Sequence, residues 1–343
     1  MASDRPRRFH HGYGADRSAT RARIPFVARK LTALLVAVTA LGGGAARGGG
    51  GPVALVTAET QNRLLAVALP SGRVLKRLPM PADPENVAVV GAKWAVVVSP
   101  RAGAVTVVST PSLRVVRVLR GFASPHVVAA TADLQGAYVT DDARGRLDVI
   151  RLSGRPRLVR SVFVGAGAHH MAVSPSGNEL WVALGERART IVVLDVSDPL
   201  RPTVVGRFDP GFAAHDLAFS SDRRVWVTAA DRRFVTVFDS LTRRPVARVP
   251  AGAPPQHVAI GYVDDAFITS GYGGSLEIVD RSSGRIRRIV RVPYGSFNVT
   301  VGGGFAVTSS LLRGTVTEVD DSGRVWLSKR FAPATRAVAV AAF

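Results

Sequence analysis

The feature that most constrains this chain is an internal repeat of about 41 residues. Seven short apolar stretches recur through the sequence: PENVAV, SPHVVAA, AHHMAV, AHDLAF, PQHVAI, SFNVTV and TRAVAV. Their aligned residues are Glu85, His126, His169, His215, Gln256, Phe297 and Arg336, separated by 41, 43, 46, 41, 41 and 39 positions. A period of about 40–45 residues is typical of one four-stranded propeller blade.

Each repeat continues with three more strand patterns in the same order. A strand bearing Trp, Tyr or Phe comes next, such as WAVVVS (94–99), and a third strand follows, such as TIVVLDV (190–196). A fourth strand, such as RIRRIVRV (285–292), ends the unit. The runs are short, β-branched and separated by turn residues, and none has the pattern of a long amphipathic helix. The sequence therefore predicts an all-β protein, a seven-bladed β-propeller with four-stranded blades.

The two ends of the repeat array together complete the seventh blade. The segments VALVTAE (53–59), RLLAVALP (63–70) and RVLKRLP (73–79) match the second, third and fourth strands of a unit. The segment ATRAVAVAAF at the C-terminus supplies only a first strand. We expect these segments to form one blade by 3+1 closure, because pairing the last strand with the first removes two open sheet edges.

The first 46 residues have the parts of an export signal. A long basic region (1–30) precedes the eleven-residue apolar run LTALLVAVTAL (31–41), and small residues follow it. We expect a signal peptide over 1–46, cut after Ala46, a Gly-rich spacer over 47–52 and the propeller over 53–343. A tail that is never cut is the alternative.

Cleavage would place the protein outside the cytoplasm, secreted or in the periplasm or cell envelope. Eleven apolar residues are too few to span a bilayer as a helix, so we expect no transmembrane anchor after cleavage. The chain has no cysteine, which excludes disulfides, thiolate metal sites and lipoprotein acylation. We also expect a monomer.

The formal net charge of +20 raises the question of a polyanionic partner. Only four of the 45 basic residues are lysines, as a GC-rich coding bias would produce, and the basic residues look scattered along the sequence. Nucleic acid or another anionic polymer is therefore the weakest of the partner hypotheses.

Several stretches carry a family resemblance: HHMAVSPSGNELWVALG, YVTDD, WVTAAD and FITSG, each followed by a strand like TIVVLDV. With them the chain resembles the YVTN-type β-propeller repeat family, which includes the bacterial periplasmic YncE-like proteins, over residues 53–343. The resemblance implies a seven-bladed propeller. It implies no particular activity, because propellers host many functions.

All five histidines of the repeat array lie at the aligned position or one residue after it. First strands line the central channel of a propeller, so we expect residues at these two positions to meet at one mouth of the channel. The predicted ligand-binding residues are Glu85, Asn86, His126, His169, His170, His215, Asp216, Gln256, His257, Asn298 and Arg336.

Histidines gathered with carboxylates suit a divalent metal such as Zn, Cu, Ni or Fe. His126, His169 and His215, from three adjacent blades, are the predicted metal ligands, because three imidazoles leave an open coordination position. The alternative is structural, with imidazole nitrogens bonding backbone carbonyls of neighbouring blades. The sequence has no nucleophile elbow, P-loop or His-Glu-x-x-His motif, and no catalytic residue is assigned.

These observations favour a non-catalytic binding protein or scaffold of the cell envelope. Its expected ligand, a small molecule or an envelope protein, would bind at the polar, histidine-rich mouth of the channel. The alternative is a metal-dependent propeller hydrolase or lyase, similar to the propeller lactonases, that uses the channel histidines.

Overall fold

The computed structural model describes residues 51–341. The expected signal peptide (1–46) and most of the Gly-rich spacer lie outside the described residues. The described chain is built of β-strands, with one short 3₁₀ helix, η1 (Glu59–Gln61). Within residues 51–341, no helix has the length and hydropathy needed to cross a membrane.

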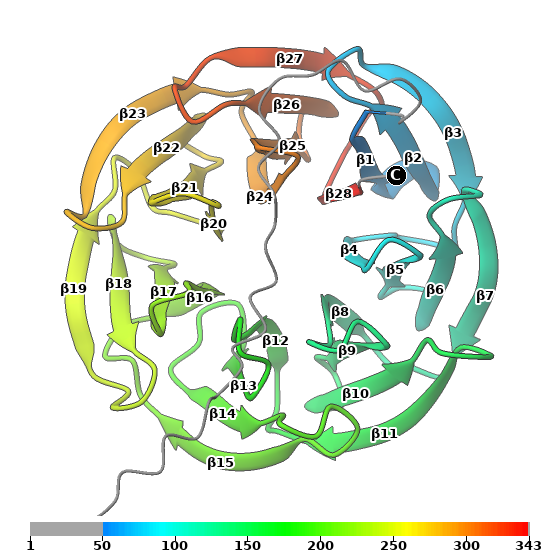
Figure 1. The fold of residues 1–343 in the computed structure, drawn as a ribbon, viewed down its shortest axis with the longest axis horizontal. Helices are drawn as coiled ribbons and strands as arrows, with labels where there is room; N and C mark the ends of the chain where they lie inside the picture. The colour runs from blue at the N-terminus through cyan, green and yellow to red at the C-terminus, as the bar shows by residue number, and fades with distance from the viewer. Residues whose placement is uncertain (1–50, 342–343) are drawn as a thin grey trace, which may run out of the picture. The chain divides into compact units, whose positions relative to one another are not determined.

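Seven antiparallel sheets of four strands each stand side by side in a ring (Figure 1). The inner strands are β4 (Asn86–Val90), β8 (Pro125–Ala130), β12 (Ala168–Val173), β16 (Ala214–Phe219), β20 (Val258–Ile260), β24 (Ser296–Gly302) and β28 (Val338–Ala341). The second strands are β1 (Val53–Ala58), β5 (Trp94–Ser99), β9 (Gly136–Asp141), β13 (Glu179–Leu184), β17 (Arg224–Ala229), β21 (Asp265–Ser270) and β25 (Phe305–Ser310). The predicted seven-bladed β-propeller is confirmed.

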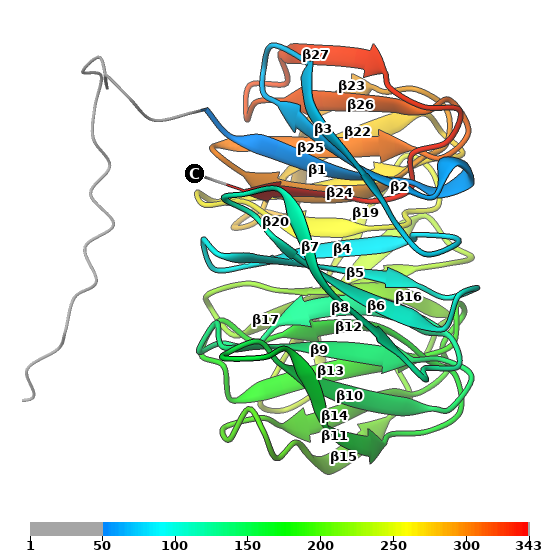
Figure 2. The ribbon, with the colours of Figure 1, turned by 90° about the vertical axis from the view of Figure 1, so that its right-hand side faces the viewer.

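The third and fourth strands build the outer half of each blade. The third strands are β2 (Arg63–Ala68), β6 (Ala104–Ser109), β10 (Arg146–Arg151), β14 (Ile191–Asp195), β18 (Phe234–Asp239), β22 (Ser275–Asp280) and β26 (Thr315–Val319). The outer strands are β3 (Arg73–Pro79), β7 (Arg114–Arg120), β11 (Arg157–Phe163), β15 (Thr203–Phe208), β19 (Pro245–Pro250), β23 (Arg285–Arg291) and β27 (Val325–Arg330). Figure 2 shows β3 and β7 crossing the outside of their blades.

The ring is closed as the two chain ends predict. One sheet has the strand order β28-β1-β2-β3, so the C-terminal strand forms a blade with the three N-terminal strands. The antiparallel register pairs Val53 with Ala341 and Val56 with Val338. This 3+1 closure pairs β1 on both sides, with β2 and β28, so the seventh blade has four strands like the other six.

The hydrophobic core lies between neighbouring blades. The second and third strands are buried on both faces, and every residue of β1 and β9 is buried. Trp181, fully buried on β13, meets Phe208 and Phe219 edge to face at ring-centroid distances of 5.1 and 5.7 Å. The β-branched and aromatic runs of the repeat fit such a doubly covered surface.

Threonines of the second strands hold the inner strands in place. The hydroxyl of Thr140 donates a hydrogen bond to the carbonyl oxygen of His169 on the next blade (2.7 Å), and Thr228 donates likewise to Gln256 (2.9 Å). Thr57 makes the equivalent bond to Glu85 (3.3 Å). These bonds fix aligned residues of successive blades at one level of the channel.

Two third strands carry a buried glutamate, Glu318 on β26 and Glu277 on β22, and the first of them leads to a prediction about stability. Both carboxyl oxygens of Glu318 are buried without a hydrogen-bond partner among the described residues. Burial raises the pKa of Glu318 above its ordinary 4.5. We expect Glu318→Met to raise the free energy of unfolding at pH 7 by about 1–3 kcal/mol, the cost of burying an unsatisfied polar group.

The sign of the pH dependence follows from the raised pKa of Glu318. Glu318 costs no stability below its ordinary pKa of 4.5, where it is protonated in both states, and its cost grows as the pH rises through the pKa of the folded state, so the gain from methionine shrinks in acid. Urea denaturation at pH 4 and pH 7 measures both effects. Glu277→Met is the control: one oxygen of Glu277 accepts the Gly252 N–H (2.7 Å), so its gain is smaller. A gain for Glu318→Met that does not change with pH would contradict the prediction.

Candidate functional site

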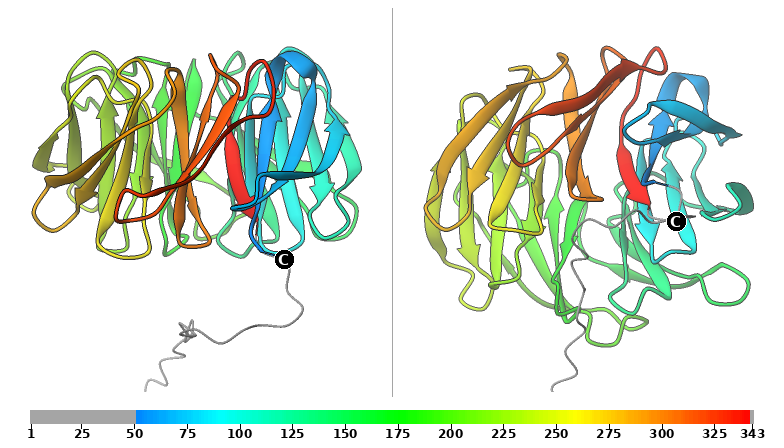
Figure 3. Two further views of the ribbon diagram at one scale, coloured as in Figure 1. Left: turned by 90° about the horizontal axis from the view of Figure 1, so that it is seen from above. Right: turned by 45° about the horizontal axis from the view of Figure 1, so that its top comes forward.

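A cavity of about 550 Å³ opens at one mouth of the central channel. The strands run across the height of the ring, so the connecting loops gather on its two faces (Figure 3). Ten of the eleven residues predicted to bind a ligand line this cavity; the exception is Asp216, which is buried at 8% exposure. Residues spread over about 250 positions of sequence therefore meet at one site.

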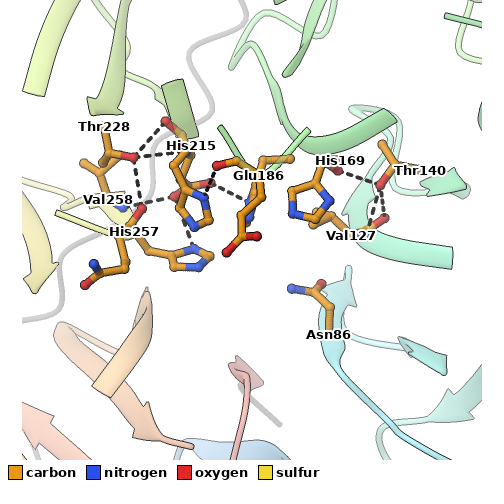
Figure 4. A network of polar contacts seen from close by, with 12 residues as sticks. Asn86, Val127, Thr140, His169, Glu186, His215, Thr228, His257 and Val258 are labelled. Atoms are coloured by element: carbon orange, nitrogen blue, oxygen red, sulfur yellow. Dashed lines mark hydrogen bonds and ion pairs between the residues drawn. The ribbon is translucent and has the colours of Figure 1, made fainter. Parts of the chain in front are cut away.

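The five histidines of the propeller form one continuous cluster. His126 and His169 stack at a ring-centroid distance of 3.7 Å, and His170 meets His169 at 4.9 Å. His170 also lies 4.5 Å from His215 and 4.9 Å from His257. Figure 4 shows His169, His215 and His257 lying around one common space. His170 is the central member of the cluster.

Local backbone irregularities bring histidines at two consecutive positions to the same mouth. Successive side chains of a regular strand point to opposite faces, which would separate His169 from His170. The pairing of β12 with β13 shifts register between Ala168 and Met171, the segment that contains both histidines. β-bulges of this kind redirect side chains near functional sites.

Every imidazole of the cluster uses its Nδ1 atom to bind an acceptor on a neighbouring blade. His169 binds the Asp142 carboxylate (2.9 Å), His126 binds Glu85 (3.3 Å) and His215 binds the carbonyl oxygen of Glu186 (2.9 Å). The remaining two share Asp216, whose carboxylate lies 3.2 Å from Nδ1 of His170 and 3.3 Å from Nδ1 of His257.

These contacts decide which ring nitrogen is available. A carboxylate or carbonyl oxygen accepts a hydrogen bond, so Nδ1 carries the proton and Nε2 of a neutral imidazole keeps its lone pair. Among residues 51–341, no hydrogen bond or ion pair engages Nε2 of any of the five histidines. The same carboxylate–histidine arrangement orients metal-ligating histidines in metalloproteins.

Burial keeps several of these imidazoles neutral. Burial and the nearby His126 lower the pKa of His169 to about 4, although Asp142 opposes the shift. Burial and His215 also hold the pKa of His170 well below 6.5. Burial, together with His257, also lowers the pKa of His215. Neutral imidazole is the form that binds a metal ion.

Asp216 is the buried support of the cluster. Burial raises the pKa of its carboxyl group, but contacts with His257 and His170 outweigh that effect and hold the pKa well below its ordinary 3.8. Its Oδ2 atom also accepts the backbone N–H of Val258 on the next blade (3.0 Å). Asp216 thus fixes two imidazoles and ties two blades together.

The ring nitrogens form two groups suited to a metal ion. One nitrogen from each of His126, His169 and His170 lies within 4.8 Å of the others, and His170, His215 and His257 form a second such group. The expected ligand set was His126, His169 and His215. The structure instead groups His215 with His170 and His257, and it makes His170 a member of both groups.

Two of the predicted residues also bond the backbone of the next blade. The side-chain oxygen of Asn86 accepts the N–H of Val128 (3.2 Å), and that of Asn298 accepts the N–H of Val338 (3.2 Å). Gln256 bonds Gly271 within its own blade. Blade-to-blade bonding, the structural alternative for this ring, is therefore present alongside the unengaged Nε2 atoms.

The opposite wall of the cavity is charged and aromatic. Arg336 forms ion pairs with Glu59 (3.1 Å) and Glu85 (3.4 Å). Burial raises the pKa of Glu85, but His126 and Arg336 more than offset this and lower it below 4.5. Phe297 stands at the aligned position that histidine occupies elsewhere, and Tyr272 meets its ring at 4.9 Å.

The sequence prediction missed Asp142, Glu186 and Tyr272. All three lie in turns that follow second strands, at the mouth where the inner strands begin. In the sequence they lie well after the aligned position of each repeat, so they do not belong to the two columns around the first strand. An acidic or aromatic residue in this turn is the signal that could have identified them.

Comparison with known proteins gives the fold and no family. No family model matches the chain, and no curated protein does. A functionally unknown protein from Desulfotomaculum acetoxidans is similar in structure, with a TM-score of 0.72 and 13% identity over 84% of this chain and 98% of that chain.

Two further solved structures show the same similarity. For apo AztD from Citrobacter koseri the TM-score is 0.68, with 12% identity over 86% of this chain and 99% of that chain. For Kuenenia stuttgartiensis hydrazine synthase it is 0.67, with 17% identity over 78% and 91% of the two chains. At such identities the similarity shows that this chain is built as a β-propeller.

Proposed function

We propose that this propeller is a binding protein whose ligand is a divalent transition-metal ion, held by histidines at the mouth of the central channel. One observation carries the proposal: all five clustered imidazoles are bonded through Nδ1 to an acceptor, which leaves Nε2 free to bind an ion. A purely structural ring would not need the second nitrogen of each imidazole to stay unengaged.

The imidazole nitrogens favour a transition-metal ion over a hard, oxygen-binding ion. Imidazole nitrogens suit Zn²⁺, Cu²⁺ and Ni²⁺, whereas Mg²⁺ and Ca²⁺ prefer oxygen ligands. His170 belongs to both three-histidine groups and offers one free nitrogen. The two groups are therefore alternative sites for about one ion per chain.

A metal-dependent hydrolase or lyase is the second candidate function. A three-histidine site leaves an open coordination position, and the cavity of about 550 Å³ has room for an organic substrate beside the ion. When bound there, the metal would act as a Lewis acid. The cavity alone favours this candidate, and no residue is assigned a catalytic role.

The family and the location are part of the same proposal. The second-strand threonines that bond the next blade lie in the YVTDD, WVTAA and FITSG stretches, which supports a relationship with the YVTN-type, YncE-like propellers.

The apolar run at 31–41 supports export, and we place the protein in the periplasm, the cell envelope or the medium.

Elemental analysis of the purified protein tests the metal proposal. After incubation with Zn²⁺, Cu²⁺ or Ni²⁺ and gel filtration, we expect about one ion per chain in the wild type. The triple variant His126→Ala/His169→Ala/His215→Ala breaks both histidine groups, and we expect it to retain none. Circular dichroism confirms that the variant is folded. A wild type that stays free of metal after all three incubations would refute the proposal.

A further inference from the structure

The outer strands carry a strong charge asymmetry that the linear sequence conceals. Across the seven outer strands, sixteen residues are Lys or Arg and none is Asp or Glu. All sixteen except Arg117 are exposed. The acidic residues of the described chain lie elsewhere, in the turns and in the other strands.

This basic surface has almost no acidic partner within the described chain. Among residues 51–341, Arg287 is the one basic residue of the outer strands that forms an ion pair, with Asp265. A coding preference for arginine explains why fourteen of the sixteen basic residues are Arg. It does not explain why acidic residues are absent from every outer strand. The positive charge is therefore unneutralised and faces solvent around the rim.

The charge is concentrated on one arc of the rim. Consecutive blades are neighbours in the ring, so β23, β27, β3, β7 and β11 follow one another around the circumference (Figure 1). These five strands hold fourteen of the sixteen basic residues, and β15 and β19 hold one each. We define the exposed basic residues of these five strands as the basic arc.

We propose that the basic arc binds a flexible linear polyanion whose charges are phosphate groups. A flat membrane touches a disc at one part of its edge, whereas a flexible chain can follow an arc that extends over five blades. Arginine suits this ligand because its guanidinium group binds phosphate oxygens in a bidentate manner. The arc lies on the outer strands and does not depend on the histidine cavity.

The outer strands have few exposed aromatic residues, which argues against a ligand that is bound through its nucleic-acid bases. Proteins that hold single strands through their bases place successive aromatic side chains along the path. The exposed aromatics of the outer strands are Phe163 on β11 and Trp326 on β27. Trp326 is already stacked against Arg324 (4.3 Å). A polymer with a charged backbone and no bases therefore fits the surface better.

Salt-dependent binding of inorganic polyphosphate to the full chain tests this proposal. With about six phosphate contacts, each adding about 0.7 to the slope, we expect affinity to fall about 300-fold between 50 and 200 mM salt. The variant Lys76→Gln/Arg77→Gln/Arg285→Gln/Arg288→Gln removes four charges of the basic arc. Each lost contact should lower the slope of log affinity against log salt by about 0.7, so we expect a loss of about 3.

A matched variant separates the basic arc from net charge alone. Arg101→Gln/Arg189→Gln/Arg232→Gln/Arg313→Gln removes four exposed arginines from turns between second and third strands, and we expect its slope to change by less than about 1. Equal losses in the two variants would overturn the proposal in favour of non-specific attraction. Tighter binding of single-stranded oligo(dT), or of phosphatidylglycerol vesicles, than of polyphosphate would also overturn it.

Discussion

Replacing His170 by phenylalanine is expected to weaken Zn²⁺ binding by a factor of about 10–100 or more. His170 belongs to both three-histidine groups, so its loss leaves each group with two imidazoles. Phenylalanine has a similar shape and fills the site, where His170 is 5% exposed. Losing one ligand of three should weaken Zn²⁺ binding at least as much as a lost supporting contact does, about 10–100-fold. Isothermal titration with Zn²⁺ measures the change.

Asp216→Asn tests the role of Nδ1 in the same site. An asparagine oxygen in the place of Oδ2 can still accept the Val258 N–H and contact His257, so the amide takes the place of Oδ1 and donates to Nδ1 of His170. That bond places the imidazole proton on Nε2 and blocks the metal-binding atom. We expect Zn²⁺ affinity to fall about 10–100-fold with the fold retained.

Asn298→Ala is the control for both substitutions. Asn298 lines the same cavity and bonds the next blade through Val338, but it offers no imidazole. We expect this variant to melt at a lower temperature and to keep wild-type Zn²⁺ affinity. Unchanged affinity in the folded His170 and Asp216 variants would refute the metal site.

Deleting residues 337–343 is expected to unfold the whole propeller. The deletion removes β28, which pairs with β1 at four positions and buries Val338, Ala339 and Ala341. Burying one valine contributes about 1.5–3 kcal/mol, and each hydrogen bond adds about 1 kcal/mol. The total, about 5 kcal/mol or more, approaches the entire stability of a typical domain, about 5–15 kcal/mol.

Thermal denaturation of three variants checks this prediction. We expect the deletion to show no cooperative transition at growth temperatures. The substitution Val338→Asp, which keeps the chain length and places a charge at a buried site, should be similarly damaging. Removing residues 342–343 alone leaves β28 intact and is the control. A deletion variant that melts as the wild type does would show that the ring does not depend on this closure.

Most of the fold could be predicted because strand patterns, turn residues and the repeat are visible in short stretches of the sequence. Short runs of β-branched residues bounded by turn signals mark the strands, and WAVVVS, the expected strand over 94–99, is β5. Closure was predictable because TRAVAVAAF matches a first strand and no other. The repeat also placed the histidines in two aligned columns, which was enough to predict that they meet at one mouth.

The chemistry of the mouth was decided by contacts between blades. The availability of Nε2 depends on Asp216, which the repeat placed at the mouth, and also on Asp142 and Glu186. These two lie in turns of neighbouring blades, and periodicity does not link them to the imidazoles they hold. The central position of His170 depends on the register shift in β12, which a strict alternation pattern does not predict.

The sequence by itself determined the blades, their number, their closure and the columns in which the histidines stand, because strand patterns and repeat spacing are local properties of the chain. Only the tertiary structure decided which imidazole nitrogen is free, which histidines group together and where the basic residues gather. Those features arise when side chains far apart in sequence are packed side by side, and their geometry depends on the finished ring.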